Sequence, residues 1–361
     1  MKRILQSVLL SFAPLAIAAQ TPTDTTATEL DDVTVHAARM LNMKSMGVEN
    51  KEIIGKTELF RAACCNLGES FTTNPSVDVN YSDAATGAKQ IKLLGLSGTY
   101  VQMMTENIPN FRGAAGPFAL GYVPGTWMQS IQVSKGASSV KNGYESITGQ
   151  INIEYVKPQL TDHLSVNMYA NSKAKLEANA DASIHLNDKW STGLLLHYED
   201  QYANHDENKD GFQDLPRVRQ YHGMWRWGYF SDSFISQFGV NGLKEYRKSG
   251  QMDMDHSALH SPYKINIETD RYEAFAKNAF VLDREHNTNI ALILSGSIHK
   301  ADAAYGNKLY NLNQKNLYAS LIFENDFSDM HKLSAGLSFN RDSYDDCFNY
   351  SGSSYGLGSP L

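Results

Sequence analysis

The second half of the chain alternates between apolar and polar residues. In "HKLSAGLSFN" every second residue from Leu333 to Phe339 is apolar, and "LYASLIFEN" and "HLSVNMYA" follow the same pattern. In "MWRWGYF" the aromatic residues fall on one face and Arg226 falls on the other. A period of two with one apolar face predicts β-strands. The pattern recurs as far as Phe348 with no helical period between, so this half is predicted to form antiparallel strands.

The links between these strands are tight at some positions and long at others. "LNDKW", "SDSF", "DREHNTN" and "FSDMHK" are short turns, whereas residues 201–217 and 250–269 form long links. A soluble β-sandwich would also alternate, but short turns on one side and long loops on the other are typical of outer-membrane barrels. The spacing of the links predicts about nine strands, several of them long enough to cross a bilayer at a tilt.

The stretch from Met43 to Pro158 has the mixed pattern of a small globular domain. "TELFRAACCNLGESFTTNPSV" predicts a helix over Glu58–Phe71, ended by Asn74-Pro75. "KQIKLLGL" and "TYVQMMTENIP" predict two short strands around a turn at Ser97-Gly98.

A spacer rich in Gly and Ser separates two β-branched runs, IQV and INIEYV, near the end of this stretch. Gly136 and Gly143 in the spacer can adopt positive φ and turn the chain tightly. The two runs are therefore predicted to pair as strands through Ile131, Val133, Ile151 and Ile153.

The N-terminus has the pattern of an export signal. Lys2 and Arg3 precede an apolar run, Ile4–Ala18, that ends in the small-x-small sequence Ala16-Ile17-Ala18. The run is too short to span a bilayer, which favours a signal peptide over residues 1–18 rather than a membrane anchor. Residues 19–42 begin with a Thr-, Pro- and Asp-rich tract and are predicted to be mobile.

Charge and cysteine content narrow the function further. The net charge of −7 argues against a general nucleic-acid binder, because neutralising phosphates requires a basic surface. In an oxidising compartment, the three cysteines Cys64, Cys65 and Cys347 leave at least one thiol unpaired. The chain shows no paired catalytic carboxylates, nucleophile motif or phosphate-binding glycine loop, so no enzymatic activity is predicted.

The segment "DENKDGFQD" places oxygen-bearing side chains at the spacing of a calcium loop. Asp206, Asn208, Asp210 and Asp214 take positions 1, 3, 5 and 9, and a glycine takes position 6. Arg217 stands where the bidentate glutamate of an EF-hand belongs. The segment is therefore either a structural Ca²⁺ site or an acidic loop that faces solvent.

Two further groups carry side chains that bind soft metals. "QMDMDHSALH" brings together Met252, Met254, His256 and His260, and thioether and imidazole ligands suit copper. A Met-rich loop without a metal is the alternative. The pair Cys64-Cys65 could also bind a soft metal, but two buried small residues on the predicted helix are the simpler interpretation.

The order of motifs from Glu69 to Pro158 resembles the plug domain of TonB-dependent outer-membrane receptors. It contains "ESFTTNPSV", "IKLLGL", "VQMMTENIP" and "VPGTWMQSIQVSKGASSVKNGYESITGQINI" in the family's order. The resemblance assigns plug-motif positions to Gly95, Pro109, Gly136, Gly143 and Gly149.

Three positions depart from the family's motifs. Leu94 stands for an arginine, Glu106-Asn107 stands for Asp-Gly, and Gln150 stands for a second glycine. These variations resemble the receptors of Bacteroides-type bacteria.

The resemblance implies a fold and a transport function. The fold is an α+β plug over residues 43–158, followed by antiparallel transmembrane strands over 159–361 that form part of a 22-stranded-type β-barrel. "LDDVTVHA" sits where the family's TonB box sits, which implies that TonB, in the TonB–ExbB–ExbD complex, binds Leu30, Asp31, Asp32, Val33, Thr34 and Val35. The implied ligand is a small metal complex such as a siderophore, haem or cobalamin, and no cofactor is required.

Several expectations remain open from the sequence. About nine strands cannot close so large a barrel in lipid, so we expect an N-terminal fragment of a longer receptor. The barrel would sit in the outer membrane of a Gram-negative bacterium, in contact with its lipid. A glycan importer of the same superfamily, a passive porin and an adhesin-like surface barrel are the alternatives.

Overall fold

The computed structural model describes residues 51–62, 65–72, 74, 77–137, 143–160, 163–252, 262–328 and 331–350. The predicted signal peptide and the segment Leu30–Val35 lie outside the described residues, as do Cys64, Met254, His256 and His260. Every described residue belongs to one compact unit, Ser45–Leu361.

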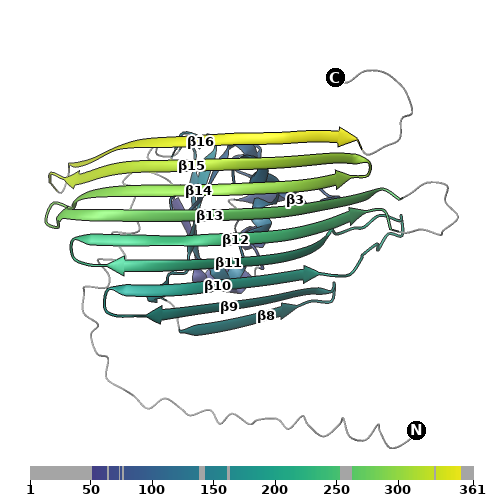
Figure 1. Ribbon diagram of the computed structural model, residues 1–361, viewed down its shortest axis with the longest axis horizontal. Coiled ribbons are helices and arrows are strands. Elements are labelled where there is room, and N and C mark those ends of the chain that lie inside the picture. The colour runs from purple at the N-terminus through teal and green to yellow at the C-terminus, as the bar shows by residue number, and fades with distance from the viewer. Residues whose placement is uncertain are drawn as a thin grey trace, which may run out of the picture. The chain divides into compact units, whose positions relative to one another are not determined.

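Nine antiparallel strands form one sheet in which each strand pairs with its neighbours in sequence (Figure 1). The first five are β8 (Leu164–Ala170), β9 (Lys175–His185), β10 (Trp190–Gln201), β11 (Arg217–Phe230) and β12 (Phe234–Gly250). The last four are β13 (Lys264–Asp283), β14 (Thr288–Tyr305), β15 (Lys308–Asp326) and β16 (Lys332–Tyr350). The prediction of about nine alternating strands is confirmed.

Tight turns and long loops are distributed as the link lengths predicted. The strand ends that flank the four quoted turns all lie at one end of the sheet, and the strand ends that flank residues 202–216 and 251–263 lie at the other, where two tight links also occur (Figure 1). The second loop ends before Lys264 rather than at Thr269. Ile265 and Ile267 belong to β13, where they are buried together with Ala303 of β14.

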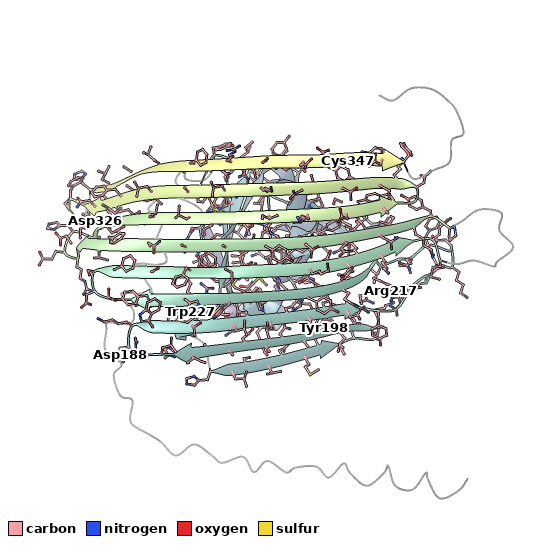
Figure 2. The ribbon with its side chains drawn as sticks, in the orientation of Figure 1. Asp188, Tyr198, Arg217, Trp227, Asp326 and Cys347 are labelled. Carbon is pink, nitrogen blue, oxygen red and sulfur yellow. The ribbon has the colours of Figure 1, made fainter. Side chains whose placement is uncertain are left out.

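The two faces of the sheet differ, as the alternation predicted. On β11, Trp225 is 50% exposed whereas the side chain of Arg226 is almost fully buried. Tyr198 and Trp227 project from the strands near opposite ends of the sheet (Figure 2). We call the face that carries Trp225 the outer face, and the face that carries Arg226 the inner face.

The residues before β8 form a separate α+β domain, which we call the plug. Its main sheet has the order β1-β6-β7-β4-β5, and β2 and β3 form a hairpin. The strands are β1 (Lys51–Gly55), β2 (Asp78–Asp83), β3 (Ala88–Lys92), β4 (Val101–Thr105), β5 (Ile108–Pro109), β6 (Met128–Lys135) and β7 (Gly149–Tyr155). The helical segments are α2 (Lys56–Ala62) and the 3-10 turns η1 (Glu69–Phe71), η2 (Gly98–Tyr100), η3 (Gly113–Gly121), η4 (Gly125–Trp127) and η6 (Pro158–Leu160).

The pairing predicted across the Gly-rich spacer is confirmed. In the antiparallel pair β6–β7, Ile131 lies opposite Ile153 and Val133 lies opposite Ile151. All four side chains are buried in the core of the plug, together with Trp127. Their burial supplies the hydrophobic stabilisation of this sheet.

The helix predicted over Glu58–Phe71 is wrong in its second half. The helix α2 begins at Lys56, and residues 65–68 are not helical. There the amide of Leu67 donates to the carbonyl of Val123 at 3.0 Å, and the amide of Gly68 donates to that of Leu120 at 3.2 Å. Hydrogen bonds to a distant segment therefore replace those of a continued helix.

The two strands predicted around Ser97-Gly98 exist but do not pair with each other. β3 pairs with β2, which the sequence analysis did not predict, and β4 runs parallel to β7. Of the helices in the described ranges, none is long and apolar enough to cross a membrane.

Candidate functional site: the contact between plug and wall

The plug packs against the inner face of the nine-stranded sheet, which we call the wall. Leu195, Met224 and Leu243 of the wall belong to the hydrophobic core of the plug, and polar side chains make the rest of the contact described here. Among the described residues of the wall, those that reach plug atoms by hydrogen bonds include Gln220, Arg226, Arg247, Arg271, Lys277 and Gln314. They come from four strands, so the contact extends from β11 to β15. The hydrogen bonds of these buried side chains are complete only when the plug is in place.

The turn between β4 and β5 presents a carboxylate to the wall. Glu106 and Asn107 both have positive φ, 51° and 65°, as a two-residue hairpin turn of type I′ requires. The amide of Glu106 donates to the carbonyl of Ile153 at 2.8 Å, and the amide of Asn107 donates to Oδ1 of Asn152 at 2.7 Å. These bonds hold the turn, although Glu106 is a costly residue at positive φ.

Glu106 is paired with two cations of the wall. Nη1 of Arg226 lies 2.8 Å from Oε1 of Glu106, and Nη2 donates to Oε2 at 3.1 Å. Nζ of Lys277 donates to the backbone carbonyl of Glu106 at 3.0 Å. Burial opposes ionisation of the carboxyl, but the charges of Arg226, Lys277 and Lys157 outweigh it and lower the pKa of Glu106 to about 2.

Two wall arginines contact the plug through the same two kinds of interaction. Arg247 donates to the carbonyl of Thr86 at 2.9 Å, and its guanidinium lies 4.4 Å from the ring centre of Phe118. Arg271 donates to Oδ1 of Asn110 at 2.7 Å and lies 5.5 Å from the ring centre of Phe111. Each combines a hydrogen bond with a cation–π contact, a geometry to which the planar guanidinium is suited.

The last strands of the wall contact the plug at η3. Nη1 of Arg112 lies 3.2 Å from Oδ2 of Asp342, and Oε1 of Gln314 accepts a bond from the amide of Ala114 at 2.9 Å. A Cβ atom added to Gly113 would lie 2.3 Å from the hydroxyl of Tyr344, and Gly113 has a φ of +58°. A glycine is therefore required for this close approach.

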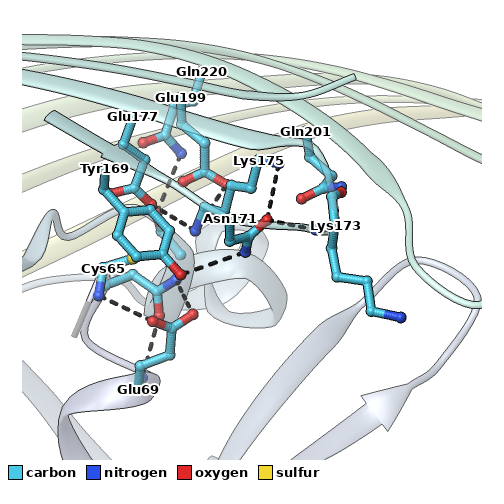
Figure 3. A network of polar contacts seen from close by, with 12 residues as sticks. Cys65, Glu69, Tyr169, Asn171, Lys173, Lys175, Glu177, Glu199, Gln201 and Gln220 are labelled. Carbon is cyan, nitrogen blue, oxygen red and sulfur yellow. Dashed lines mark hydrogen bonds and ion pairs between the residues drawn. The ribbon is translucent and has the colours of Figure 1, made fainter. Parts of the chain in front are cut away.

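A buried polar network surrounds Cys65 where the plug meets β9 and β10 (Figure 3). The amide of Cys65 donates to Oε2 of Glu69 at 2.9 Å. Nζ of Lys175 lies 2.6 Å from Oε1 of Glu177 and 3.5 Å from Oε1 of Glu199. Burial, with the charges of Glu177 and Glu69, raises the pKa of the Cys65 thiol, which is therefore protonated.

Cys65 follows α2 rather than lying on a long helix, and its thiol is free and buried. A cavity of about 150 Å³ lies beside the network. Its charged lining comes from both plug and wall: Glu69, Lys89, Lys175, Glu199, Glu245 and Arg247. Charged groups of the plug and of the wall therefore share this cavity, beside the apolar contact that Leu195 makes with the core of the plug.

The plug-motif residues lie at turns and at tightly packed positions of the plug. Gly95, Gly136 and Gly143 have φ values of +77°, +86° and +121°. Gly149 has no room for a side chain, because a Cβ atom would lie 2.4 Å from the carbonyl oxygen of Ser134. Pro109 is buried in β5. These residues shape the domain and do not form a ligand pocket of their own.

The predicted calcium segment is an exposed loop. The carboxylate of Asp206 accepts bonds from the amides of Asp210 and Gly211, and that of Asp214 accepts one from the amide of Glu207. The described residues contain no group of three or more His, Cys, Asp or Glu side chains arranged for a metal ion. Asn208 bonds to Asp210 through its side-chain amide. The Ca²⁺ site remains a prediction.

The copper-type site also remains a prediction, because only Met252 of its four residues is described. The functional residues that sequence reasoning missed are Glu106, Arg247 and Arg271. Arg226 is different, because the sequence places it on the face of its strand opposite the aromatic residues. A cation on the inner face of a strand requires a partner, and here the partner belongs to the plug.

Comparison with known proteins shows what the domain that makes this contact is similar to. Residues 47–150 match the family model of the TonB-dependent Receptor Plug Domain. The chain is 23% identical over 187 residues to the Vitamin B12 transporter BtuB of Vibrio vulnificus (strain YJ016), a match that covers 51% of this chain and 28% of BtuB.

Solved structures share the fold. The siderophore receptor PiuA from Acinetobacter baumannii superimposes with a TM-score of 0.67 at 11% identity, covering 88% of this chain and 50% of PiuA. The copper transporter OprC superimposes with a TM-score of 0.66 at 12% identity, covering 83% of this chain and 48% of OprC. The chain thus spans about half the length of these receptors. Residues 47–150 are thus similar to the plug domain of TonB-dependent receptors, and the antiparallel strands that follow share the fold of the barrel in these solved structures.

Proposed function

We propose that this protein imports a scarce metal complex across the outer membrane of a Gram-negative bacterium, driven by TonB. The observation that carries the proposal is a plug domain held to the inner face of the wall by buried ion pairs, with Glu106 and Arg226 at the centre. A plug that is bonded in this way closes the lumen at rest. Transport then requires an energy input that rearranges the plug.

The segment Leu30–Val35 is the proposed point at which this energy enters. Its β-branched residues favour an extended conformation, and an extended segment can add a strand to the sheet edge of a partner. TonB, within the TonB–ExbB–ExbD complex, would bind this segment in the periplasm after export and removal of residues 1–18. Pulling on it would open the least stable parts of the plug first.

The names of similar proteins support the proposed substrate class. Their names describe a vitamin B12 transporter, a siderophore receptor and a copper transporter. These cargoes have a metal ion in common, either free or in a complex. For this reason we favour a metal complex over the oligosaccharide that a glycan importer would take up.

A proline substitution tests the proposal. Val33→Pro removes a backbone N–H donor from the proposed pairing segment and should abolish energised uptake. Cells that depend on this receptor would be given labelled cyanocobalamin and a panel of ferric siderophores. Thr26→Pro, in the Thr-rich tract before the segment, is the matched control and should transport normally.

Uptake that survives Val33→Pro would contradict the role of this segment. Growth on an oligosaccharide that requires the receptor, with no uptake of any metal complex, would instead favour the glycan importer.

A further inference from the structure

Two histidine side chains meet at the junction of β8 and β9. His163 stands directly before β8, and His185 is the last residue of β9. The centres of their rings are 6.3 Å apart, and the ring planes lie at 85° to each other. Both side chains are exposed. The two rings are therefore close neighbours that solvent can reach.

Strand register places both histidines on the face of the wall that carries Arg226. The amide of Ser183 donates to the carbonyl of His163 at 3.0 Å, which continues the register of the β8–β9 pair. Ser183 lies opposite Gly193, and Gly193 lies opposite Arg226. His185 is two residues beyond Ser183, so its side chain lies on the same face. The pair therefore belongs to the inner face.

The pair lies at the end of the sheet that carries the tight turns. His185 precedes the turn that contains Asp188, which Figure 2 places at that end. The last turn of the plug, η6, approaches the same strands, since a Cβ atom added to Gly193 would lie 3.0 Å from Cγ of Pro158. Short turns of outer-membrane barrels face the periplasm. In that orientation the pair lies at the periplasmic mouth of the lumen.

Hydrogen bonding decides which nitrogen of His163 is available. Its Nδ1 lies 3.3 Å from the carbonyl oxygen of Ser183, and because a carbonyl only accepts, Nδ1 carries the proton. Nε2 then has a free lone pair. Metal-binding histidines commonly donate their other N–H to a carbonyl in this way. Within the described ranges, His185 forms no hydrogen bond or ion pair, so its ring nitrogens are also available.

Small rotations would let both rings reach one metal ion. Two nitrogen ligands at about 2.0–2.1 Å from a tetrahedral ion lie roughly 3.4 Å apart. The χ2 angle of histidine varies over a broad range, and both side chains are exposed. Among the residues that the structure describes, no third His, Cys, Asp or Glu joins the pair in a group that could hold a metal. Water would therefore complete the coordination.

We infer that His163 and His185 bind a hydrated divalent transition-metal ion through one ring nitrogen each, and that Cu²⁺ is bound most tightly. Imidazole suits copper, nickel and zinc, and the affinity of nitrogen sites for divalent first-row ions is highest for Cu²⁺. The second imidazole binds an ion that the first already holds, which raises the affinity above that of a single surface histidine. The inference rests on the proposed function only for the side of the membrane that the pair faces.

Electron paramagnetic resonance of bound Cu²⁺ tests the inference. The whole protein in detergent would carry His256→Asn and His260→Asn, which remove the predicted copper-type site, and would receive equimolar copper sulfate. Coupling to the remote nitrogen of each bound ring counts the imidazoles, and two per ion are expected. His163→Ala and His185→Ala should each reduce this to one and should weaken Cu²⁺ affinity by roughly tenfold or more, because the second ligand is lost.

His286→Ala is the matched control. His286 is an exposed histidine in another turn at the same end of the sheet, but its Nδ1 lies 2.7 Å from a carboxylate oxygen of Asp283. Its removal should leave the two-imidazole spectrum and the affinity unchanged. Since the side chains of His163 and His185 are exposed, their substitution removes no buried contact. Equal far-UV circular dichroism of all variants checks that the sheet is retained.

Absence of Cu²⁺ binding, a single imidazole per ion in the parent protein, or a two-imidazole spectrum that survives either substitution would overturn the inference. An equal loss in His286→Ala would do so as well, because it would assign the copper to scattered surface histidines. The Val33→Pro variant should bind Cu²⁺ normally although its uptake is abolished. A failure of the transport proposal is therefore distinguishable from a failure of this one.

Discussion

Glu106 shows how much a single residue contributes to the contact between plug and wall. Its side chain is 4% exposed and is paired with the side chain of Arg226, which is 2% exposed. The free energy needed to desolvate two charges offsets much of their electrostatic attraction. A buried ion pair is therefore weak evidence for net stability. Removal of one partner is different, because it leaves the other charge buried and uncompensated.

We expect Glu106→Gln to destabilise the plug by roughly 3–5 kcal/mol, the usual cost of breaking a buried ion pair from one side. Urea unfolding of the plug, followed by the fluorescence of Trp127, measures the loss. Asp188→Asn, in an exposed turn of the wall, is the control and should have no effect. An unchanged urea midpoint in Glu106→Gln would mean that the ion pair does not hold the plug.

The pH dependence of the same measurement gives a second readout. The pKa of Glu106 is lowered from 4.5 to about 2 in the folded protein. The ionised carboxylate therefore contributes its full stabilisation above about pH 4.5, and this contribution is lost as the pH falls toward 2. The Glu106→Gln variant lacks this part of the acid dependence, so the two stability curves should converge at low pH.

At the scale of elements, the β6–β7 pair is the part of the plug that the sequence describes best. Its β-branched runs and the glycines of its spacer predict that the two strands pair, and the structure supplies their register. Gly149 adds a constraint that only the structure reveals, since Ser134 and Leu93 occupy the space where a Cβ atom would stand.

We expect Gly149→Ala to destabilise the plug by about 1–3 kcal/mol, because the added methyl group overpacks a site that backbone atoms close. Gly55→Ala in β1 is the matched control, since nothing lies within 4 Å of a Cβ atom there. Amide hydrogen exchange of β6 and β7 would compare the two variants with the unmodified protein. Equal protection in all three would show that the site can relax.

The α2 region shows why element prediction failed elsewhere in the plug. "TELFRAACCNLGESF" has the composition of a helix, but residues 65–68 bond to residues near η4 instead. Helix propensity is a weak prior that tertiary contacts override. The same reasoning applies to β3. Its composition does not show that it pairs with β2 rather than with β4.

At the scale of the whole molecule, the plug and the wall have separate roles. The wall supplies a rigid face of alternating side chains, and the plug supplies the groups that satisfy its inner cations. Removing the plug would leave Arg226, Arg247 and Arg271 facing the lumen, where water can solvate them.

We expect deletion of residues 43–158 to turn a plugged importer into a leaky pore. The measurement is the entry of a large antibiotic such as vancomycin into cells that produce the deletion variant. The Val33→Pro variant, which retains the plug, is the control and should stay impermeable. An adhesin-like barrel would lose little permeability control on deletion, and that result would contradict the proposed function.

The sequence by itself determined the strands of the wall, the faces on which their side chains lie, and the order of the plug motifs. Each of these depends on a local repeat of two residues or on short spacings that are visible in the chain. Only the tertiary structure decided which charges meet, where α2 ends, and that β4 pairs with β7. Those outcomes join residues as far apart as Glu106 and Arg226, and no local pattern specifies the partner of a buried charge.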